Sequence, residues 1–315
     1  MIDPVGREVT YLRFSLTDRC NLKCRYCTLP SDPKEALTAQ DVETILSAAA
    51  GIGFKKVRFT GGEPTLRKDL PEIIERCVAI PGIEEICLTT NGLLLDKLAA
   101  PLRKVGLTHL NLSCDTLDAD RFSDITAGGS LARWRRGFEA CLAAGFPSVK
   151  VNAVLMGGFN EDEGPAFAEF ARDYGVEVRF IEYMPTESAR KDWWRVPVDE
   201  FERDLVKAFE LQSRKASRHG GPARIYSFPD GDGRLGFIQA MSNPFCERCN
   251  RLRVTSDGKI RSCLLTGGEV DLLTSIRAGA TTEQLQTLIR MAAAQKPVVY
   301  ELHAEQDLDM RSVGG

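Results

Sequence analysis

Residues 10–27 have the sequence Thr-Tyr-Leu-Arg-Phe-Ser-Leu-Thr-Asp-Arg-Cys-Asn-Leu-Lys-Cys-Arg-Tyr-Cys. The first eight alternate in polarity, which predicts a β-strand, and a loop with three cysteines follows at once. Cys20, Cys24 and Cys27 have the spacing C-x3-C-x2-C, with no fourth cysteine or histidine close by. Three thiolates leave one iron of an iron–sulfur cube open to a small molecule. The alternative is a zinc knuckle completed by a distant residue.

The strand-then-helix pattern repeats toward the C-terminus. Further strands are predicted at residues 56–60, 85–89, 109–113, 149–154 and 176–183. Helices are predicted between them, at residues 38–50, 70–80, 93–105, 131–144 and 162–174. This alternation implies a parallel sheet with right-handed crossovers. We therefore predict an α/β fold with an incomplete (β/α)6 barrel, whose functional loops follow the C-terminal ends of the strands.

The alternation stops near residue 211. Beyond it, turns at Asp230–Gly233 and Asp257–Gly258 predict two hairpins, and amphipathic helices are predicted at residues 198–209, 272–278 and 282–295. We divide the chain into a barrel, residues 1–210, and a C-terminal α+β region, residues 211–315.

Composition limits the class of protein. The chain has 315 residues, 43% of them hydrophobic, and a net charge of −3, so nothing in its charge attracts nucleic acid or a membrane. No apolar run approaches the ~18 residues of a membrane span, and no signal peptide is recognisable. Ten cysteines without a secretion signal predict metal ligation in a reducing compartment, the cytoplasm.

Cationic residues lie within the predicted barrel strands, namely Arg13, Lys56, Arg58, Lys150 and Arg179. Strands of a parallel barrel are buried on both faces, where an unpaired cation is costly. These cations either pair with internal carboxylates, for which Glu63, Asp115 and Glu182 are the candidates, or line a lumen that receives a polyanion. The number of cations favours the lumen.

A second cysteine set lies at Cys246, Cys249 and Cys263, with spacing C-x2-C-x13-C. It again lacks a fourth ligand, so it predicts a second cube with an open iron, or else a zinc site completed by His303. Arg251 and Arg253 alternate on a predicted strand and therefore share one face beside this metal.

Gly61-Gly62-Glu63-Pro64 follows the second strand. Consecutive glycines allow a backbone edge to approach a ligand closely, here the molecule held at the open iron, although a plain strand-to-helix turn would also use them. The remaining cysteines have apolar neighbours and are predicted to be small hydrophobic core residues: Cys77, Cys87, Cys114 and Cys141.

These motifs together resemble a known family. The first cysteine loop and the Gly-Gly-Glu-Pro turn are similar to the radical S-adenosylmethionine (SAM) superfamily. Residues 245–253, 257–264 and 179–185, with the terminal Gly314-Gly315, resemble the GTP 3′,8-cyclase family, the molybdenum cofactor biosynthesis protein A family. The resemblance covers essentially the whole chain, in the family's order.

The resemblance implies a lyase with two [4Fe–4S] clusters and SAM. The N-terminal cluster would reduce SAM to methionine and a 5′-deoxyadenosyl radical, which removes the C3′ hydrogen of GTP. The C3′ radical attacks C8 of guanine and gives (8S)-3′,8-cyclo-7,8-dihydroguanosine 5′-triphosphate, in the first step of molybdenum cofactor biosynthesis. The C-terminal cluster would bind the guanine.

The resemblance also assigns residues and partners. It implies SAM contacts at Tyr26, Gly62, Ser113 and Met184. It implies GTP contacts at Arg13, Arg58, Thr89, Lys150, Arg251 and Arg253, with Lys56 and Arg179 as further phosphate contacts. The tail Gly314-Gly315 is expected to reach the active site. Cyclic pyranopterin monophosphate synthase is the implied downstream enzyme, a homodimer is suggested, and the reductant is unspecified.

Two other functions are compatible with parts of the sequence. One is a different radical SAM enzyme with an auxiliary cluster, such as a peptide-modifying enzyme, which would cleave SAM without regard to GTP. The other is a zinc-binding interaction protein without catalysis, which would contain zinc and no iron.

Overall fold

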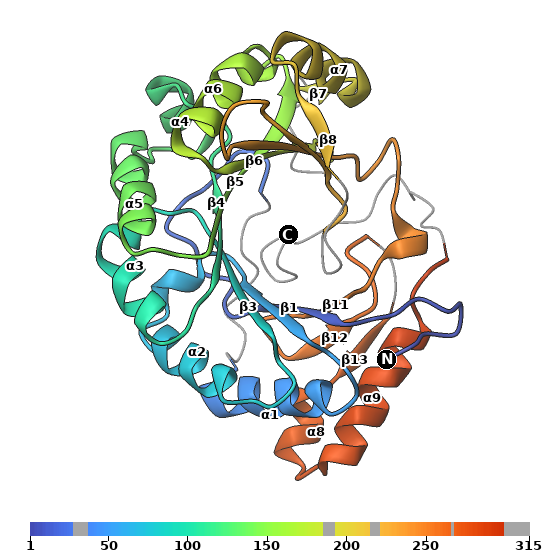
Figure 1. Cartoon of the computed structure of the whole chain (residues 1–315). Coiled ribbons are helices and arrows are strands. Elements are labelled where there is room, and N and C mark those ends of the chain that lie inside the picture. Colours follow the sequence, from blue (N-terminus) through green and yellow to red (C-terminus); the bar gives the residue numbers. More distant parts are fainter. Residues whose placement is uncertain (28–36, 185–192, 215–220, 266–267, 299–315) are drawn as a thin grey trace.

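The structure is a computed structural model and describes residues 1–27, 37–184, 193–214, 221–265 and 268–298. A curved sheet encloses a central space, and most of the helices lie on its outer side (Figure 1). No helix in these ranges is both long and apolar enough to cross a lipid bilayer.

The six barrel strands lie side by side in chain order and are parallel. They are β1 (Tyr11–Ser15), β2 (Lys56–Thr60), β3 (Glu85–Thr90), β4 (His109–Ser113), β5 (Ser148–Gly157) and β6 (Glu177–Glu182). The connecting helices are α1 (Ala39–Ala50), α2 (Leu70–Val78), α3 (Leu95–Lys104), α5 (Leu131–Ala143) and α6 (Gly164–Tyr174). The prediction of an incomplete barrel is confirmed, because the described sheet runs from β13 to β8 without closing.

Strands from the C-terminal region extend both edges of this sheet. Strand β11 (Arg251–Val254) pairs in parallel with β1, and β10 (Arg234–Ile238) pairs in parallel with β6. Antiparallel strands follow on each side: β12 (Lys259–Arg261), β13 (Glu269–Asp271), β9 (Arg224–Ser227) and β8 (Gln212–Arg214). The second cysteine set is thereby brought beside the first strand of the barrel.

Local sequence explains where the helices begin. Thr38 and Asp41 form a capping box at the start of α1, and the apolar stripe of that helix is buried as its spacing predicts. Helix α9 (Thr282–Ala294) begins with the same type of box, formed by Thr281 and Gln284. The chain start lies beside α9 (Figure 1).

The remaining elements are short or lie outside the barrel repeat. They are α4 (Ala119–Ile125), α7 (Val198–Ala208), α8 (Leu273–Arg277), β7 (Trp194–Arg195), and single turns at Pro64–Leu66, Glu161–Glu163 and Cys246–Arg248. Helix α4 was not predicted, because its seven residues give too little periodicity to stand out.

Candidate active site

One cavity of about 800 Å³ lies on the inner side of the sheet. Both cysteine sets line it: Cys20, Cys24, Cys27, Cys246, Cys249 and Cys263. So do the four residues predicted to contact SAM, namely Tyr26, Gly62, Ser113 and Met184. The residues predicted to contact GTP line it as well: Arg13, Lys56, Arg58, Thr89, Lys150, Arg179, Arg251 and Arg253. Gly314 and Gly315 lie outside the described residues.

The first cysteine loop begins immediately beyond β1. Its three thiols are partly exposed and line the cavity. None of the ten cysteines of the chain forms a disulfide. The Leu22 amide donates to Cys20 Sγ at 3.4 Å, and Asn91 Nδ2 lies 4.0 Å from the same sulfur. Three thiols that face one space, one of them with N–H donors beside its sulfur, are a suitable donor set for an iron–sulfur cluster.

The Gly61-Gly62 turn lies directly against this loop. The Gly62 amide donates to Thr17 O at 2.6 Å and the Glu63 amide to Arg19 O at 2.7 Å. A Cβ atom on Gly62 would lie 2.2 Å from Arg19 O. Glycine is therefore required here because two backbones meet, which the sequence argument about ligand approach did not include.

Gly62→Ala is expected to destabilise the fold by about 1–3 kcal/mol, because the new methyl group forces the cysteine loop away from the turn. Denaturant titration of the free energy of unfolding tests this. Gly221→Ala is the control, since a Cβ there would meet nothing nearer than 3.8 Å. Equal stability of the two variants would show that the loop accommodates the methyl group.

Glu63 is fully buried and organises the neighbouring loops. Its carboxylate accepts hydrogen bonds from Thr65 N at 3.0 Å, Thr90 Oγ1 at 2.7 Å and Asn91 N at 2.7 Å. The Asn91 side chain then reaches Asn21 Oδ1 at 2.7 Å, within the cysteine loop. Glu63 thus connects the turn after β2, the turn after β3 and the cysteine loop, and it is not a partner of the strand cations.

Tyr26 is held by a buried carboxylate. Its hydroxyl donates to Asp115 Oδ2 at 2.7 Å, and the Val154 amide donates to Asp115 Oδ1 at 2.9 Å. Burial raises the pKa of Asp115 from 3.8 to about 6, although both hydrogen bonds oppose the shift.

This shift makes stability depend on pH in a definite direction. Between pH 3.8 and 6 the folded chain keeps a proton on Asp115 that the unfolded chain has released, so the free energy of unfolding falls as pH rises through this window. Across this window the free energy of unfolding decreases by about 3 kcal/mol. Parallel denaturant titrations of the wild type and Asp115→Asn should show this contribution only in the wild type; identical pH slopes would contradict it.

Three arginines form a row across adjacent strands. Arg13 on β1 is in register with Arg58 on β2 and with Arg253 on β11. Residues in register on parallel strands point to the same side, so the three guanidinium groups face the cavity together. Burial lowers the pKa of Arg13 to about 10, and burial together with repulsion from Arg13 and Arg251 also lowers the pKa of Arg253.

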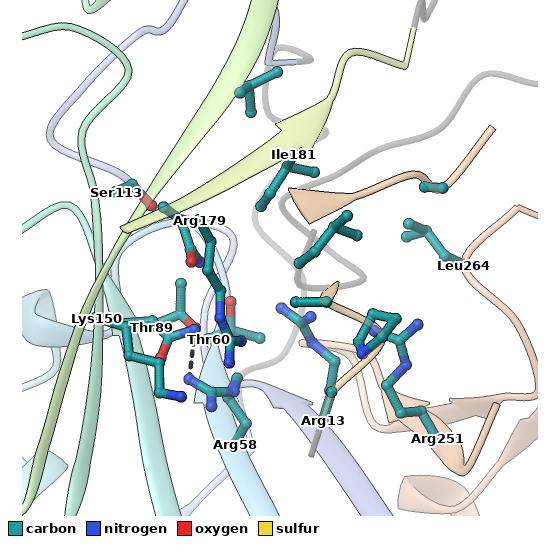
Figure 2. A pocket seen from close by; sticks show the side chains of 18 of the residues that line it. Arg13, Arg58, Thr60, Thr89, Ser113, Lys150, Arg179, Ile181, Arg251 and Leu264 are labelled. Atoms are coloured by element: carbon teal, nitrogen blue, oxygen red, sulfur yellow. Dashed lines mark hydrogen bonds between the residues drawn. The ribbon is translucent and has the colours of Figure 1, made fainter. Parts of the chain in front are cut away.

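Lys150 and Arg179 add further cations to the cavity, and Arg58 lies between them and Arg13 (Figure 2). The Arg58 guanidinium donates to Tyr11 Oη at 2.5 Å and to Thr89 Oγ1 at 3.3 Å. Burial lowers the pKa of Lys150 to about 8, and Arg179 adds to this effect while Glu177 opposes it.

The carboxylates that pair with these cations are Glu85 and Glu177. Glu85 meets Lys56 Nζ at 2.5 Å, and Glu177 meets both Lys150 Nζ at 2.9 Å and Arg179 Nε at 2.5 Å. The suggestion of Glu63, Asp115 and Glu182 as partners was therefore wrong. Glu182 instead accepts from the backbone amides of Met241 and Ser242.

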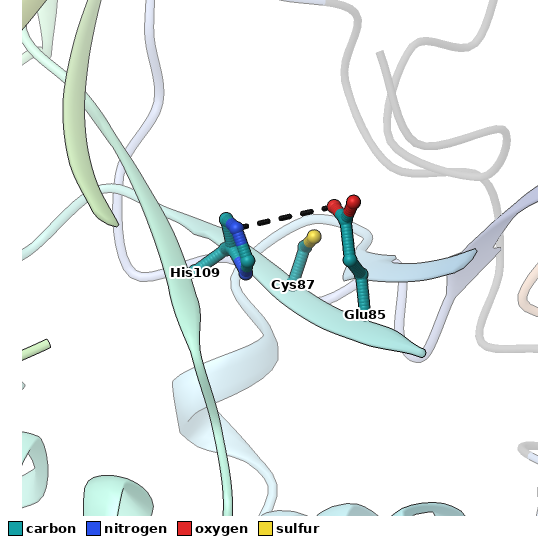
Figure 3. Close-up of side chains that lie close together, drawn as sticks. All are labelled: Glu85, Cys87 and His109. Atoms are coloured by element: carbon teal, nitrogen blue, oxygen red, sulfur yellow. Dashed lines mark ion pairs between the residues drawn. The ribbon is translucent and has the colours of Figure 1, made fainter. Parts of the chain in front are cut away.

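Glu85 also lies near two possible metal ligands, Cys87 and His109 (Figure 3). Their ligand atoms lie within 4.8 Å of one another, and His109 Nε2 is 3.9 Å from the Glu85 carboxylate. Because Lys56 already neutralises that carboxylate and Arg58 lies in the same cavity, we assign Glu85 to ion pairing rather than to metal binding.

The second cysteine set has a cationic environment. Arg251 stacks on the Phe245 ring, with its guanidinium carbon 4.8 Å from the ring centroid. Burial alone would raise the pKa of Cys249, but Arg251 and Lys296 outweigh it and lower that pKa to about 6. A thiol that ionises below neutral pH is a suitable ligand for a soft metal, so this set also fits an iron–sulfur cluster.

Sequence reasoning missed the roles of Glu85, Glu177 and Asp115. Glu85 and Glu177 each begin a strand and were not separated from ordinary surface positions. No local signal in the sequence distinguishes them, because only the register of the folded sheet places each strand start opposite a lysine on the neighbouring strand.

Comparisons with known proteins agree with this site. Residues 14–171 match the Radical SAM superfamily, and residues 176–302 match Molybdenum Cofactor Synthesis C. A GTP 3′,8-cyclase from Pelotomaculum thermopropionicum is 45% identical, covering 94% of each chain, and one from Moorella thermoacetica is 40% identical, covering 100% of each. The crystal structure of Streptococcus suis SuiB bound to S-adenosylmethionine shares the fold, with a TM-score of 0.65, 16% identity, and coverage of 86% of this chain and 66% of that one.

Two matching halves, full-length relatives and the two facing cysteine sets lead to one conclusion. The chain belongs to the GTP 3′,8-cyclase family of radical SAM enzymes.

Proposed function

We propose that the cavity converts GTP to (8S)-3′,8-cyclo-7,8-dihydroguanosine 5′-triphosphate, the first step of molybdenum cofactor biosynthesis, with the residues in the roles given below. One observation supports this most strongly: two sets of three cysteines, none of them in a disulfide, and nine arginine and lysine side chains line the same cavity. Such a cavity can receive a redox-active centre at each cysteine set and a polyanion between them.

Cys20, Cys24 and Cys27 would hold a [4Fe–4S] cluster, which would bind SAM and supply the electron for its cleavage. Tyr26, Gly62, Ser113 and Met184 line the adjacent part of the cavity and would contact SAM. Asp115 holds the Tyr26 hydroxyl, and the Gly62 amide is held by Thr17, so both SAM contacts are positioned before SAM arrives.

The cations would bind the triphosphate. A triphosphate carries about four negative charges, and arginine and lysine arrays are the usual way to bind them. Arg13 is repelled by Arg58 and Arg253 is repelled by Arg13, so an anion bound between these guanidinium groups would relieve the repulsion. Lys56, Lys150 and Arg179 are held in place by Glu85 and Glu177 and can exchange part of this pairing for phosphate.

Cys246, Cys249 and Cys263 would hold a second [4Fe–4S] cluster, whose open iron would bind guanine. Arg251 stands beside Cys249 and the ring of Phe245, where it can reach the same nucleotide. Exclusion of water would matter at this site, because a primary carbon radical must meet only its intended C–H bond.

Several wider assignments belong to the same proposal. Residues 1–210 and 211–315 act as two functional units, one for SAM and one for the auxiliary cluster. The chain forms a homodimer, and its product passes to cyclic pyranopterin monophosphate synthase. A cytoplasmic location is supported by ten free thiols, which persist in a reducing compartment.

The test uses anaerobically reconstituted protein with SAM, dithionite and GTP that carries deuterium at C3′. We expect deuterium in the 5′-deoxyadenosine formed and a cyclised triphosphate as product. Cleavage of SAM that is independent of GTP and transfers no deuterium would contradict the GTP substrate and favour another radical SAM reaction, such as peptide modification.

A further inference from the structure

Lys296 lies just beyond α9 and is buried against the second cysteine set, with 7% of the residue exposed. Its ammonium group donates to three acceptors: Cys249 Sγ at 3.5 Å, Arg251 O at 2.8 Å and Ser262 O at 3.1 Å. An ammonium group has three hydrogens, so these bonds use its full capacity. One side chain therefore joins the segment of Cys249 to the segment that precedes Cys263.

Arg7, near the chain start, completes this arrangement. Its Nη1 donates to Cys246 O at 3.0 Å and to Pro297 O at 2.7 Å, and its Nη2 donates to Lys296 O at 3.2 Å. Its Nε pairs with Asp3 at 2.6 Å. Arg7 thus holds the backbone at Lys296 and the first cysteine of the set together.

Both cations contact the cysteine segments without lining the cavity. Among the described residues, Cys246, Cys249 and Cys263 line the cavity, whereas Arg7 and Lys296 do not. This placement separates them from Arg251 and Arg253, which face the cavity. Arg7 and Lys296 are therefore placed to act on the cysteines and not on a nucleotide.

We propose that Lys296, held by Arg7, is a positioning residue that sets the geometry and the reduction potential of the second iron–sulfur cluster. This rests on the proposed role of Cys246, Cys249 and Cys263 as cluster ligands. Reduction adds a negative charge to a cluster, and an N–H···S bond from a fixed cation stabilises that charge. The pair therefore raises the reduction potential of this cluster and protects it from iron loss.

The alternative is a lysine that only ties loops together. It predicts lower stability on substitution, without a change of potential in the cluster that remains. A redox measurement separates the two because it reports on the charge beside the sulfur.

The test uses the full chain, reconstituted anaerobically, with Lys296→Met, Lys296→Arg and Lys259→Met. Lys259 is the control because it is partly exposed and pairs with Asp257 and Glu269. Spectroscopic redox titrations and release of iron to a chelator are followed for each variant. We expect Lys296→Met to move one of two cluster transitions to a more negative potential and to lose iron about 10- to 100-fold faster. Lys296→Arg should restore most of the potential.

Should Lys296→Met fail to fold, Arg7→Met gives a second comparison, since it loosens Lys296 and leaves the ammonium group in the chain. Unchanged potentials in Lys296→Met, with two clusters retained, would overturn the inference and leave the proposed cyclase intact. A wild-type chain with only four irons would overturn the ligand assignment and the inference with it.

Discussion

Cys263→Ala is expected to abolish the cyclised product while SAM is still cleaved to 5′-deoxyadenosine. The substitution removes one of three thiolates from the second set. The first set, at Cys20, Cys24 and Cys27, follows the C-terminal end of β1, whereas Cys249 precedes the N-terminal end of the parallel strand β11. Without the second cluster the guanine loses its proposed ligand, and C8 is no longer held near C3′. Chromatography of the nucleotide products tests the loss of cyclisation, and quantification of 5′-deoxyadenosine in the same reaction tests whether SAM is still cleaved.

Cys141→Ala provides the control for the loss of a thiol. Cys141 is a fully buried residue of α5 and does not line the cavity. Cys141→Ala should therefore still cleave SAM and still form the cyclised product. Normal amounts of cyclised product from Cys263→Ala would contradict an essential second cluster. Loss of SAM cleavage as well would mean that the second set supports the first, which the geometry does not predict.

Arg253→Ala and Arg251→Ala are each expected to weaken GTP binding by about 1.5–3 kcal/mol, or about 10- to 150-fold, while iron content is unchanged. The loss is one charge-assisted contact with the triphosphate in each case. Arg253 is buried beside two other cations, so its removal relieves repulsion and should not destabilise the fold. Equilibrium binding of GTP to anaerobically prepared protein measures the change.

Arg261→Ala is the matched control for these variants. Arg261 lies opposite Arg253 on β12, but it pairs with Glu269 at 3.5 Å and does not line the cavity. Its removal should leave the affinity within a factor of about two, as expected for a site away from the ligand. If Arg251→Ala and Arg253→Ala also bind GTP with wild-type affinity, neither arginine contacts the triphosphate.

Much of the fold followed from local pattern. Each barrel strand carries its own polarity signal and is followed by an amphipathic helix, so the six units could be placed within a few residues. The partners of the outer strands could not be predicted. Nothing in the sequence of β10 or β11 says that they pair with β6 and β1, because pairing depends on contacts between distant residues.

In the candidate site, too, some features could be predicted from local sequence and others depend on contacts between distant residues. The cysteine spacings and the cations in strands could be identified locally, since each is unusual where it stands. The carboxylates that pair with these cations could not, because Glu85 and Glu177 resemble surface residues until the register places a lysine opposite each. Lys296 is a similar case: it follows an ordinary amphipathic helix, and only the folded chain brings it to Cys249.

The pairing of β1 with β11 also affects how the protein is made. Tyr11 and Arg251, which are in register, stand about 240 residues apart in the chain. At a synthesis rate of about 5–20 residues per second, one edge of β1 waits about 10–50 s on the ribosome for its neighbour. An unpaired strand edge is a template for aggregation. The nascent chain should therefore need protection by a chaperone until the last quarter of the protein emerges.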